Sequence, residues 1–356
     1  MRLSDFDYPL PEALVAQEPV TPRDASRLLV LRGAGPVEHR AFVDLPGLLE
    51  PGDLLVTNDT KVIPARLVGS KVTGGKVELL LCDALDDRPD GLGPRWRALG
   101  QASKPIRAGT RLAFGDALSA RVLDVEGEGF YVVELDREGR ALEDALASVG
   151  RVPLPPYVRR PPTELDRERY QTVFARAPGS AAAPTAGLHF TPRVLEALEA
   201  RGVRRAAVTL HVGPGTFLPV RVEDVDRHRM HEERYEVSPG AAAGIAACRA
   251  RGGRIVAVGT TTVRTLESAW EAGAVRAGPG RTRLFVRPGH AFRSVDALLT
   301  NFHLPRSTLL MLVCALGGTE RVLAAYREAV SARYRFFSYG DAMLVLPPRA
   351  SHESAP

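Results

Sequence analysis

Long apolar runs, paired cysteines and a basic leader are all missing from this sequence of 356 residues. Its longest apolar run, Leu309 to Leu316, is far shorter than the ~20 residues that a membrane-spanning helix needs, so no membrane association is expected. Residues 1–12 contain acids and prolines in place of a basic, then apolar, segment, which argues against a secretory signal peptide. The three cysteines lie far apart in the chain, a pattern typical of a reducing cytoplasm and not of a disulfide framework.

Lysine is also rare, because only 4 of the 47 basic residues are Lys. A coding bias toward Arg explains much of this, but Arg also pairs bidentately with phosphate. Two stretches have a local excess of Arg: residues 151–205 contain ten Arg against five acids, and residues 272–295 contain five Arg and no acid. These excesses predict a face for a polyanion such as nucleic acid, with a solvated surface as the alternative.

The chain is long enough for one large or two modest domains. Residues 62–150 contain short β-rich runs separated by turn residues, a spacing typical of a small β-barrel or sandwich. We therefore expect an α/β (α+β) main domain, formed by residues 1–61 and 151–356, with an inserted small all-β barrel-like domain at 62–150. In the main domain we expect strands over 53–57, 205–212, 254–258 and 344–346, and helices over 192–201, 240–251, 262–272, 307–316 and 320–332.

Residues 254–264 read as a strand, a tight turn and the start of a helix. Free backbone N–H groups at such a helix start, together with the hydroxyls of Thr260, Thr261 and Thr262, bind carboxylate or phosphate well. The alternative is that these threonines only cap the helix.

A second loop, residues 210–217, places Gly213 and Gly215 directly after a predicted strand. A Gly-x-Gly in this position is found in the cofactor loops of Rossmann-type methyltransferases, but the dinucleotide-type fingerprint requires a helix next. Residues 218–222 do not start one. The loop is therefore either a turn or a place where the backbone approaches a ligand closely.

Histidines occur in three further loops. His189 lies just before a helix start at Thr191 and is a candidate general acid or base, or a structural hydrogen-bonding group. Asn301 and His303 precede an apolar helix and are not expected to be packing residues. His228 and His231 are three apart, but no cysteine or further histidine lies near them, so we predict no metal site.

Several long blocks of the chain are distinctive: DLLVTNDTKVIPAR at 53–66, APTAGLHFT at 183–191, VDALLTNFHLP at 295–305 and YRFFSYGDAML at 334–344. Shorter blocks lie at 5–7, 23–27, 154–157, 169–174, 210–217, 228–231 and 259–268. In these residues and in this order, the chain resembles the S-adenosylmethionine:tRNA ribosyltransferase-isomerase family of queuosine biosynthesis. The inserted β domain matches that family more in texture than in residues.

The resemblance implies a particular reaction. The ribosyl part of S-adenosylmethionine is moved onto the aminomethyl group of a 7-aminomethyl-7-deazaguanine base in the anticodon loop of tRNA. The ribose is rearranged to an epoxycyclopentanediol, adenine and methionine leave, and epoxyqueuosine-tRNA is formed. S-adenosylmethionine is then a co-substrate, and no metal or other cofactor is implied. We expect a monomer that works in the cytoplasm.

This chemistry needs proton-transfer groups, because a base must reach the C–H next to the sulfonium and an acid must assist the departure of adenine. In the matching motifs the candidate catalytic residues are Asp59, His189, Glu233 and Asp341. The candidate residues for binding S-adenosylmethionine are Gly187, His211, Gly213, Gly215, Thr216, Thr260, Thr261, Thr262, Arg264, Asn301 and His303. The candidate residues for tRNA phosphates are Arg159, Arg160 and Arg169.

Two other functions fit parts of the sequence. An S-adenosylmethionine-dependent RNA methyltransferase shares the basic clusters and the co-substrate, but the missing helix after the Gly-x-Gly loop argues against it. A non-catalytic RNA-binding protein needs only the β domain and the Arg-rich stretches, and leaves the polar loop motifs unexplained. The released products distinguish the three functions: adenine with methionine, S-adenosylhomocysteine, or none.

Overall fold

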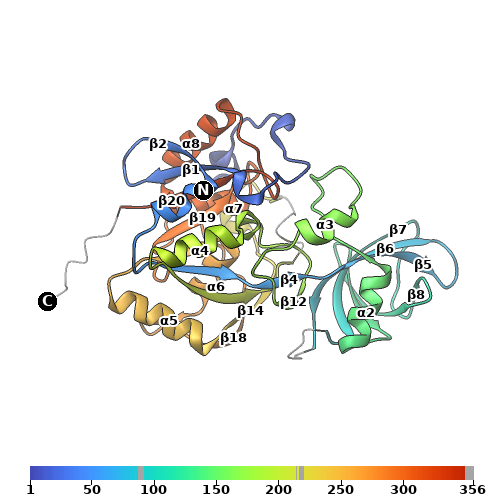
Figure 1. The fold of residues 1–356 in the computed structure, drawn as a ribbon. Helices are drawn as coiled ribbons and strands as arrows, with labels where there is room; N and C mark the ends of the chain where they lie inside the picture. Colours follow the sequence, from blue (N-terminus) through green and yellow to red (C-terminus); the bar gives the residue numbers. More distant parts are fainter. Residues whose placement is uncertain (87–91, 214, 216–219, 349–356) are drawn as a thin grey trace. The chain divides into compact units, whose positions relative to one another are not determined.

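A computed structural model of the chain describes residues 1–86, 92–213, 215 and 220–348 (Figure 1). The contacts divide the chain into two compact units. Unit 1 comprises Met1–Asn58, Pro184–Leu210 and Leu218–Pro356, and unit 2 comprises Asp59–Ala183 and His211–Phe217. Unit 2 is larger than the stretch 62–150 expected for an inserted domain, because strand β12 (Ala177–Ser180) pairs in parallel with β4 (Thr60–Val62).

Unit 1 is built on a nine-stranded mixed sheet. Its strands are β1 (Arg27–Arg32), β2 (Val37–Ala41), β3 (Leu54–Asn58), β13 (Arg204–Leu210), β14 (Glu233–Val237), β15 (Ile255–Val258), β18 (Gly278–Thr282), β19 (Ala297–Asn301) and β20 (Ala342–Leu346). Their order in the sheet is β18-β14-β13-β3-β15-β19-β20-β1-β2. The four adjacent strands β13, β3, β15 and β19 are parallel, whereas β14 and β20 run antiparallel to β13 and β19.

Every residue of β3, β15, β19 and β20 is buried, as expected for strands of an α/β sheet that is covered on both faces. The helices of unit 1 are α1 (Leu45–Leu48), α4 (Pro192–Ala200), α5 (Pro239–Ala250), α6 (Thr260–Ser268), α7 (Thr308–Gly317) and α8 (Thr319–Ser331). Helices α5 and α6 pack on β13, β3 and β15, and α7 packs on β19 and β20. Shorter elements are η1 (Leu3–Phe6), η2 (Glu12–Leu14), η3 (Arg23–Ala25), η4 (Phe42–Asp44), η5 (Thr185–His189), η7 (Val225–Arg227) and the hairpin of β16 (Trp270–Glu271) and β17 (Ala274–Val275).

The ends of two helices follow local rules that the sequence carries. Ser307 caps α7, since its hydroxyl accepts a hydrogen bond from Leu310 N at 3.2 Å. Helix α6 starts at Thr260, two residues earlier than predicted, because Gly259 occupies the position before it with φ +87°, which only glycine adopts without strain. Thr191 precedes α4 as predicted, but its hydroxyl donates to Asp24 at 2.5 Å and does not cap the helix.

Unit 2 contains a closed β-barrel. Its strands are β5 (Arg66–Lys71), β6 (Lys76–Ala84), β7 (Arg95–Ala102), β8 (Arg111–Phe114), β9 (Leu118–Gly127) and β10 (Phe130–Leu135), and β11 (Gly150–Arg151) adds to β5. The order β5-β6-β7-β10-β9-β8 closes because β5 also pairs with β8. The prediction of an inserted β-barrel is therefore confirmed, and the sandwich alternative is wrong.

The insert is not all-β, because helix α2 (Gly139–Val149) follows the last long barrel strand. Leu142, Ala145 and Leu146 of this helix belong to the same buried core as Trp96 of the barrel. Their spacing of three and four residues is the helical signal that the sequence analysis missed. A second short helix of unit 2, α3 (Glu164–Arg169), begins after Thr163.

In the described part of the chain, no helix on its own has the length and apolar character of a membrane-spanning segment. Within the same residues, only α7 and α8 taken together have both, and these two are bent by 115° relative to each other.

The closure of the barrel predicts a sensitive position at Gly69 of β5. A Cβ atom there would lie 2.1 Å from Ala113 O and 2.6 Å from the Phe114 ring, next to the closing β5–β8 pairing. We expect Gly69→Ala to lower the free energy of unfolding by about 1–3 kcal/mol or more, because the strands must move apart. Val68→Ala, at the exposed neighbouring position, should change it by less than about 0.5 kcal/mol. Denaturant unfolding of both variants checks this, and equal stabilities would contradict it.

Candidate functional site

One edge of the nine-stranded sheet collects polar residues of unit 1. The parallel strands end at this edge, at Asn58, Leu210, Val258 and Asn301. Because β14 and β20 run antiparallel to their neighbours, Glu233 and Asp341 lie at the same edge, where these two strands begin. In open α/β sheets, ligands bind outside the carboxyl ends of the parallel strands. The topology therefore marks this edge as the candidate active site of unit 1.

His189 lies at the end of η5, where its imidazole is 4% exposed. Its Nδ1 is 2.7 Å from Ser26 Oγ, and its Nε2 is 3.1 Å from Asn301 Nδ2. The same Asn301 Nδ2 donates to the carbonyl of Phe337 at 3.0 Å, which fixes the amide orientation because a carbonyl can only accept. His189 Nε2 therefore accepts a hydrogen bond from Asn301. The ring proton is on Nδ1, which donates a hydrogen bond to Ser26 Oγ.

The environment of His189 disfavours its charged form. Burial, together with the positive charges of Arg23 and Arg335, lowers the pKa of His189 to about 3. Its ring also stacks on Phe42 at 5.0 Å between centroids. A neutral imidazole with both nitrogens engaged is a weak base, so this geometry favours a positioning role over the proton transfer that the sequence predicts.

Asn301 presents an open hydrogen-bond acceptor at the same place. Asn301 is 2% exposed, and its Oδ1 has no hydrogen-bond partner among the described residues. Buried polar atoms are nearly always paired, and leaving one unpaired costs about 1–3 kcal/mol. An N–H or O–H donor of a bound substrate would satisfy this atom.

The start of α6 lies next to this edge and is free of side-chain caps. The hydroxyl of Thr262 donates to the carbonyl of Val258 at 2.7 Å, and Thr261 Oγ1 accepts from Asn58 Nδ2 at 3.3 Å. These contacts replace the capping expected as the alternative. The first backbone N–H groups of a helix have no partner within it, so Thr260, Thr261 and Thr262 offer an anion-binding start.

Arg264 and Glu233 form a buried ion pair. They are 5% and 6% exposed, and Arg264 Nε also donates to the carbonyl of Leu284 at 3.0 Å. The structure therefore joins a predicted substrate-binding residue to a predicted catalytic one. Breaking such a pair leaves a buried charge without its partner, so its first consequence is structural.

Asp341 lies at the beginning of β20, where it accepts hydrogen bonds from Arg27 N at 2.9 Å and from Arg335 N at 2.8 Å. The Arg27 guanidinium is also 3.3 Å from its carboxylate. These contacts join the starts of β1 and β20. They favour a structural role for Asp341 over the predicted catalytic role.

His303 and Gly187 are both buried near this edge. His303 Nε2 is 2.8 Å from Thr300 Oγ1, and burial lowers the pKa of His303 to about 3. The residue is therefore neutral at pH 7. Gly187 lies within η5, where its backbone N–H donates to Pro184 O at 2.9 Å.

Asp59 and His211 belong to unit 2. The carboxylate of Asp59, which is 2% exposed, accepts two hydrogen bonds from the largely exposed Arg176, at 2.7 and 3.1 Å. His211 Nδ1 is 2.9 Å from Thr60 Oγ1. A Cβ atom at Gly179, where φ is +132°, would lie 3.1 Å from the His211 ring, so glycine gives this ring room.

The remaining predicted residues of unit 2 are differently placed. Gly213 and Gly215 lie in the loop after β13, whereas Thr216 lies outside the described residues. Arg160 makes a bidentate ion pair with the buried Asp166, at 2.6 and 2.8 Å, and thereby holds the start of α3. Arg159 is exposed and Arg169 is half-buried.

Sequence reasoning assigned no role to Ser26, Arg176 or Thr300, each of which contacts a predicted site residue. Ser26 and Thr300 lie inside blocks that carry the resemblance, and this is the one signal that pointed to them. In the described residues, no three His, Cys, Asp or Glu side chains come together as a metal site would require.

Comparison with known proteins assigns the chain to a family. A family model described as queuosine biosynthesis protein matches residues 3–345, almost the whole chain. The chain belongs to this family. The resemblance predicted from the sequence blocks and the prediction of an enzyme are confirmed.

Relatives in the queuosine biosynthesis family are similar over their full length. A protein of Anaeromyxobacter sp. (strain Fw109-5), named S-adenosylmethionine:tRNA ribosyltransferase-isomerase, is 77% identical to this chain. The match covers 97% of this chain and 99% of that protein. One of the same name from Pelotomaculum thermopropionicum is 56% identical, with 97% of this chain and 100% of the relative covered.

A crystal structure described as S-adenosylmethionine tRNA ribosyltransferase from Thermotoga maritima is 42% identical. The match covers 96% of this chain and 100% of that one, with a TM-score of 0.55. These names support the predicted ribosyl transfer, and they favour neither an RNA methyltransferase nor a non-catalytic binding module.

The assigned state of His189 can be measured directly. We expect ¹⁵N NMR of the imidazole to show a neutral ring with the proton on Nδ1, unchanged from pH 8 to pH 5, because its folded pKa lies near 3. In urea the same ring should titrate near its ordinary value of about 6.5. A midpoint between pH 5 and 8 in the folded protein, or a proton on Nε2, would contradict the hydrogen-bond assignment.

Proposed function

We propose that this chain transfers and isomerises the ribosyl moiety of S-adenosylmethionine onto 7-aminomethyl-7-deazaguanine in tRNA. The products are epoxyqueuosine-tRNA, adenine and methionine. The observation that carries the proposal is the polar edge of the nine-stranded sheet, where the buried Asn301 offers an open acceptor beside a neutral His189. The membership of the queuosine biosynthesis family supports it.

The α6 start and Asn301 are proposed to bind S-adenosylmethionine. The methionine carboxylate is a small anion, and the N–H groups of Thr260, Thr261 and Thr262 suit it. Asn301 Oδ1 would accept from an amino group of the substrate, so that binding removes the cost of its unpaired state. Gly213 and Gly215 are proposed to allow close approach of the backbone to the co-substrate because they carry no side chain, and His211 and His303 are proposed to shape the site.

The proton transfers are proposed to centre on Asp59. Its carboxylate is buried and accepts hydrogen bonds from Arg176, whose side chain is 78% exposed, so substrate groups can compete with this arginine. Glu233 forms an ion pair with Arg264, and Asp341 accepts hydrogen bonds from the backbone of Arg27 and Arg335. We propose that these two acids hold the site in shape.

The tRNA is proposed to contact unit 2 through Arg159 and Arg169, with Arg160 fixing α3 beside them. The modified base in the anticodon loop is the proposed acceptor. No cofactor is proposed besides the co-substrate. Action as a monomer in the cytoplasm stays a prediction.

The activity is tested with purified protein, S-adenosylmethionine and tRNA carrying 7-aminomethyl-7-deazaguanine. We expect mass spectrometry to find a nucleoside enlarged by the rearranged ribosyl group, together with equal amounts of adenine and methionine. Omission of the tRNA should abolish the release of both. S-adenosylhomocysteine with a methylated nucleoside would overturn the proposal, as would tRNA binding without any product.

The residue roles are tested by single-turnover kinetics. We expect Asp59→Asn to slow the chemical step by about 10²–10⁴-fold, because it removes the proton acceptor. Arg176→Ala, which keeps the carboxylate but removes its ion-pair partner, should have a much smaller effect. His189→Gln should leave the shape of the pH–rate profile unchanged, because the ring does not titrate. A profile that loses one ionisation in His189→Gln would return the role of base to His189.

A further inference from the structure

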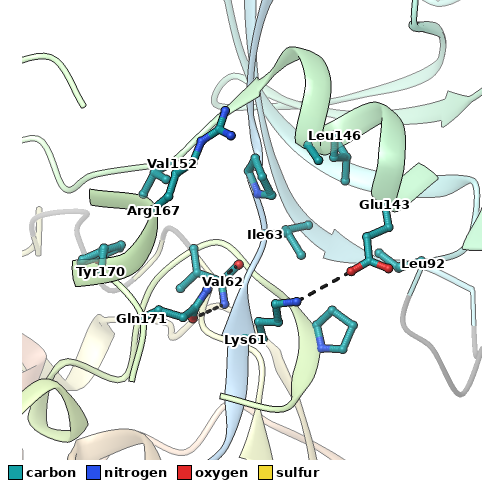
Figure 2. Close-up of a pocket in the computed structure, with 13 residues that line it drawn as sticks. Lys61, Val62, Ile63, Leu92, Glu143, Leu146, Val152, Arg167, Tyr170 and Gln171 are labelled. Carbon is teal, nitrogen blue, oxygen red and sulfur yellow. Dashed lines mark hydrogen bonds and ion pairs between the residues drawn. The ribbon is translucent and has the colours of Figure 1, made fainter. Parts of the chain in front are cut away.

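Unit 2 contains a pocket of about 240 Å³ that no step of the proposed reaction uses (Figure 2). The pocket is lined by β4 and the two residues that follow it, Ile63 and Pro64, by helix α2 and by helix α3. Its floor consists of buried side chains that are almost all apolar: Val62, Ile63, Leu92, Leu146, Val152 and Tyr170. The rings of Pro64 and Pro178 add flat surfaces to the wall.

Charged groups surround the pocket opening. Lys61 Nζ is 3.7 Å from Glu143 Oε1, and both side chains are 45% exposed (Figure 2). Arg167 lines the pocket from α3, and its contact with Glu164 is a surface pair at 3.5 Å. Exposed ion pairs of this kind contribute little to stability, so a phosphate group can replace the carboxylate as the partner of either cation.

One polar group of the lining, the side-chain amide of Gln171, is already engaged. This amide accepts a hydrogen bond from Val62 N at 2.9 Å and donates one to Val62 O at 3.0 Å (Figure 2). These are the hydrogen bonds that the backbone of a neighbouring strand would make. The mostly apolar lining favours a ligand group that has apolar faces and keeps its polar edge toward the opening.

The volume limits the occupant to one ring system. A cavity of about 150 Å³ holds a benzene ring, and pockets for drug-sized molecules begin at about 300 Å³. The pocket lies between these sizes. A nucleobase has apolar faces and a polar edge, and the phosphates on either side of it carry the charge that Lys61 and Arg167 complement.

We propose that this pocket receives one unstacked nucleotide of the RNA substrate, with its base against the apolar floor and its phosphates at Lys61 and Arg167. This rests on the proposed function for the identity of the RNA. The site recognises the shape of an extruded base, while its polar edge stays at the opening. Unit 2 is thereby given a role in selecting RNA whose loop is unstacked.

Two tryptophan substitutions on α2 test the pocket. Ala147 is exposed at its opening, on the same helix face as Glu143 and Leu146, whereas the exposed Ser148 does not line it. We expect Ala147→Trp to fill the opening and to weaken binding of the anticodon stem-loop of the substrate tRNA about tenfold or more. Ser148→Trp should stay within about twofold of the unchanged protein, with equal thermal stability for both variants.

The role of the charges is tested by salt dependence. Arg167→Ala should lower the slope of log K against log salt concentration by about 0.7, the loss of one phosphate contact on a single strand. Arg140→Ala is the matched control, because Arg140 also pairs with an acid of its own helix, at 3.3 Å, but does not line the pocket. Equal slopes for the two variants would overturn the phosphate contact.

The outcomes separate this proposal from the proposed function. If the unchanged protein forms product and Ala147→Trp binds RNA as Ser148→Trp does, the pocket proposal is wrong and the activity stands. If Ala147→Trp weakens S-adenosylmethionine binding and leaves RNA binding unchanged, the pocket belongs to the co-substrate, and the proposal is again wrong. If the unchanged protein forms no product, the proposed function itself fails.

Discussion

The side chain of Asn58 connects the points where the chain leaves unit 1. Its amide accepts from Leu210 N at 3.1 Å, donates to Leu210 O at 2.9 Å and reaches Thr261 Oγ1 at 3.3 Å. Asn58 and Leu210 are the last residues of unit 1 before each passage into unit 2. One buried amide thus joins both exits to the start of α6, and the polar edge of the sheet depends on these three segments being held in register.

The polar edge combines strong internal pairing with a few unpaired atoms. Arg264 with Glu233, and Asp341 with Arg27 and Arg335, are engaged within the protein. Among the described residues, Asn301 Oδ1, Arg264 Nη2 and the first N–H groups of α6 are exceptions. Because the surrounding groups are fixed by their partners, these few atoms keep a defined direction, which is what a preorganised binding site needs.

The sequence predicted much of the fold and less of the site, for physical reasons. The barrel strands, five helices of unit 1 and the strands β3, β13, β15 and β20 have local patterns, so they were predicted, whereas the other five strands of the main sheet were missed. The blocks around His189 and Asn301 lie at the polar edge of that sheet. Helix α2 was missed because its short pattern lies inside a β-rich stretch. The roles of His189 and Asp341 depend on partners 163 and 314 residues away, Ser26 and Arg27. A single sequence contains no record of such pairings.

The position of β20 in the sheet has a consequence for how the chain is made. This strand, Ala342–Leu346, lies between β19 and β1, so residues from both ends of the chain must meet before the nine strands are continuous. All six strands of the barrel lie within residues 66–135 and can pair while later residues are still being synthesised. The barrel strands can therefore pair early on the ribosome, whereas the sheet edge that carries Asn301 takes its final form only after the last strand has emerged.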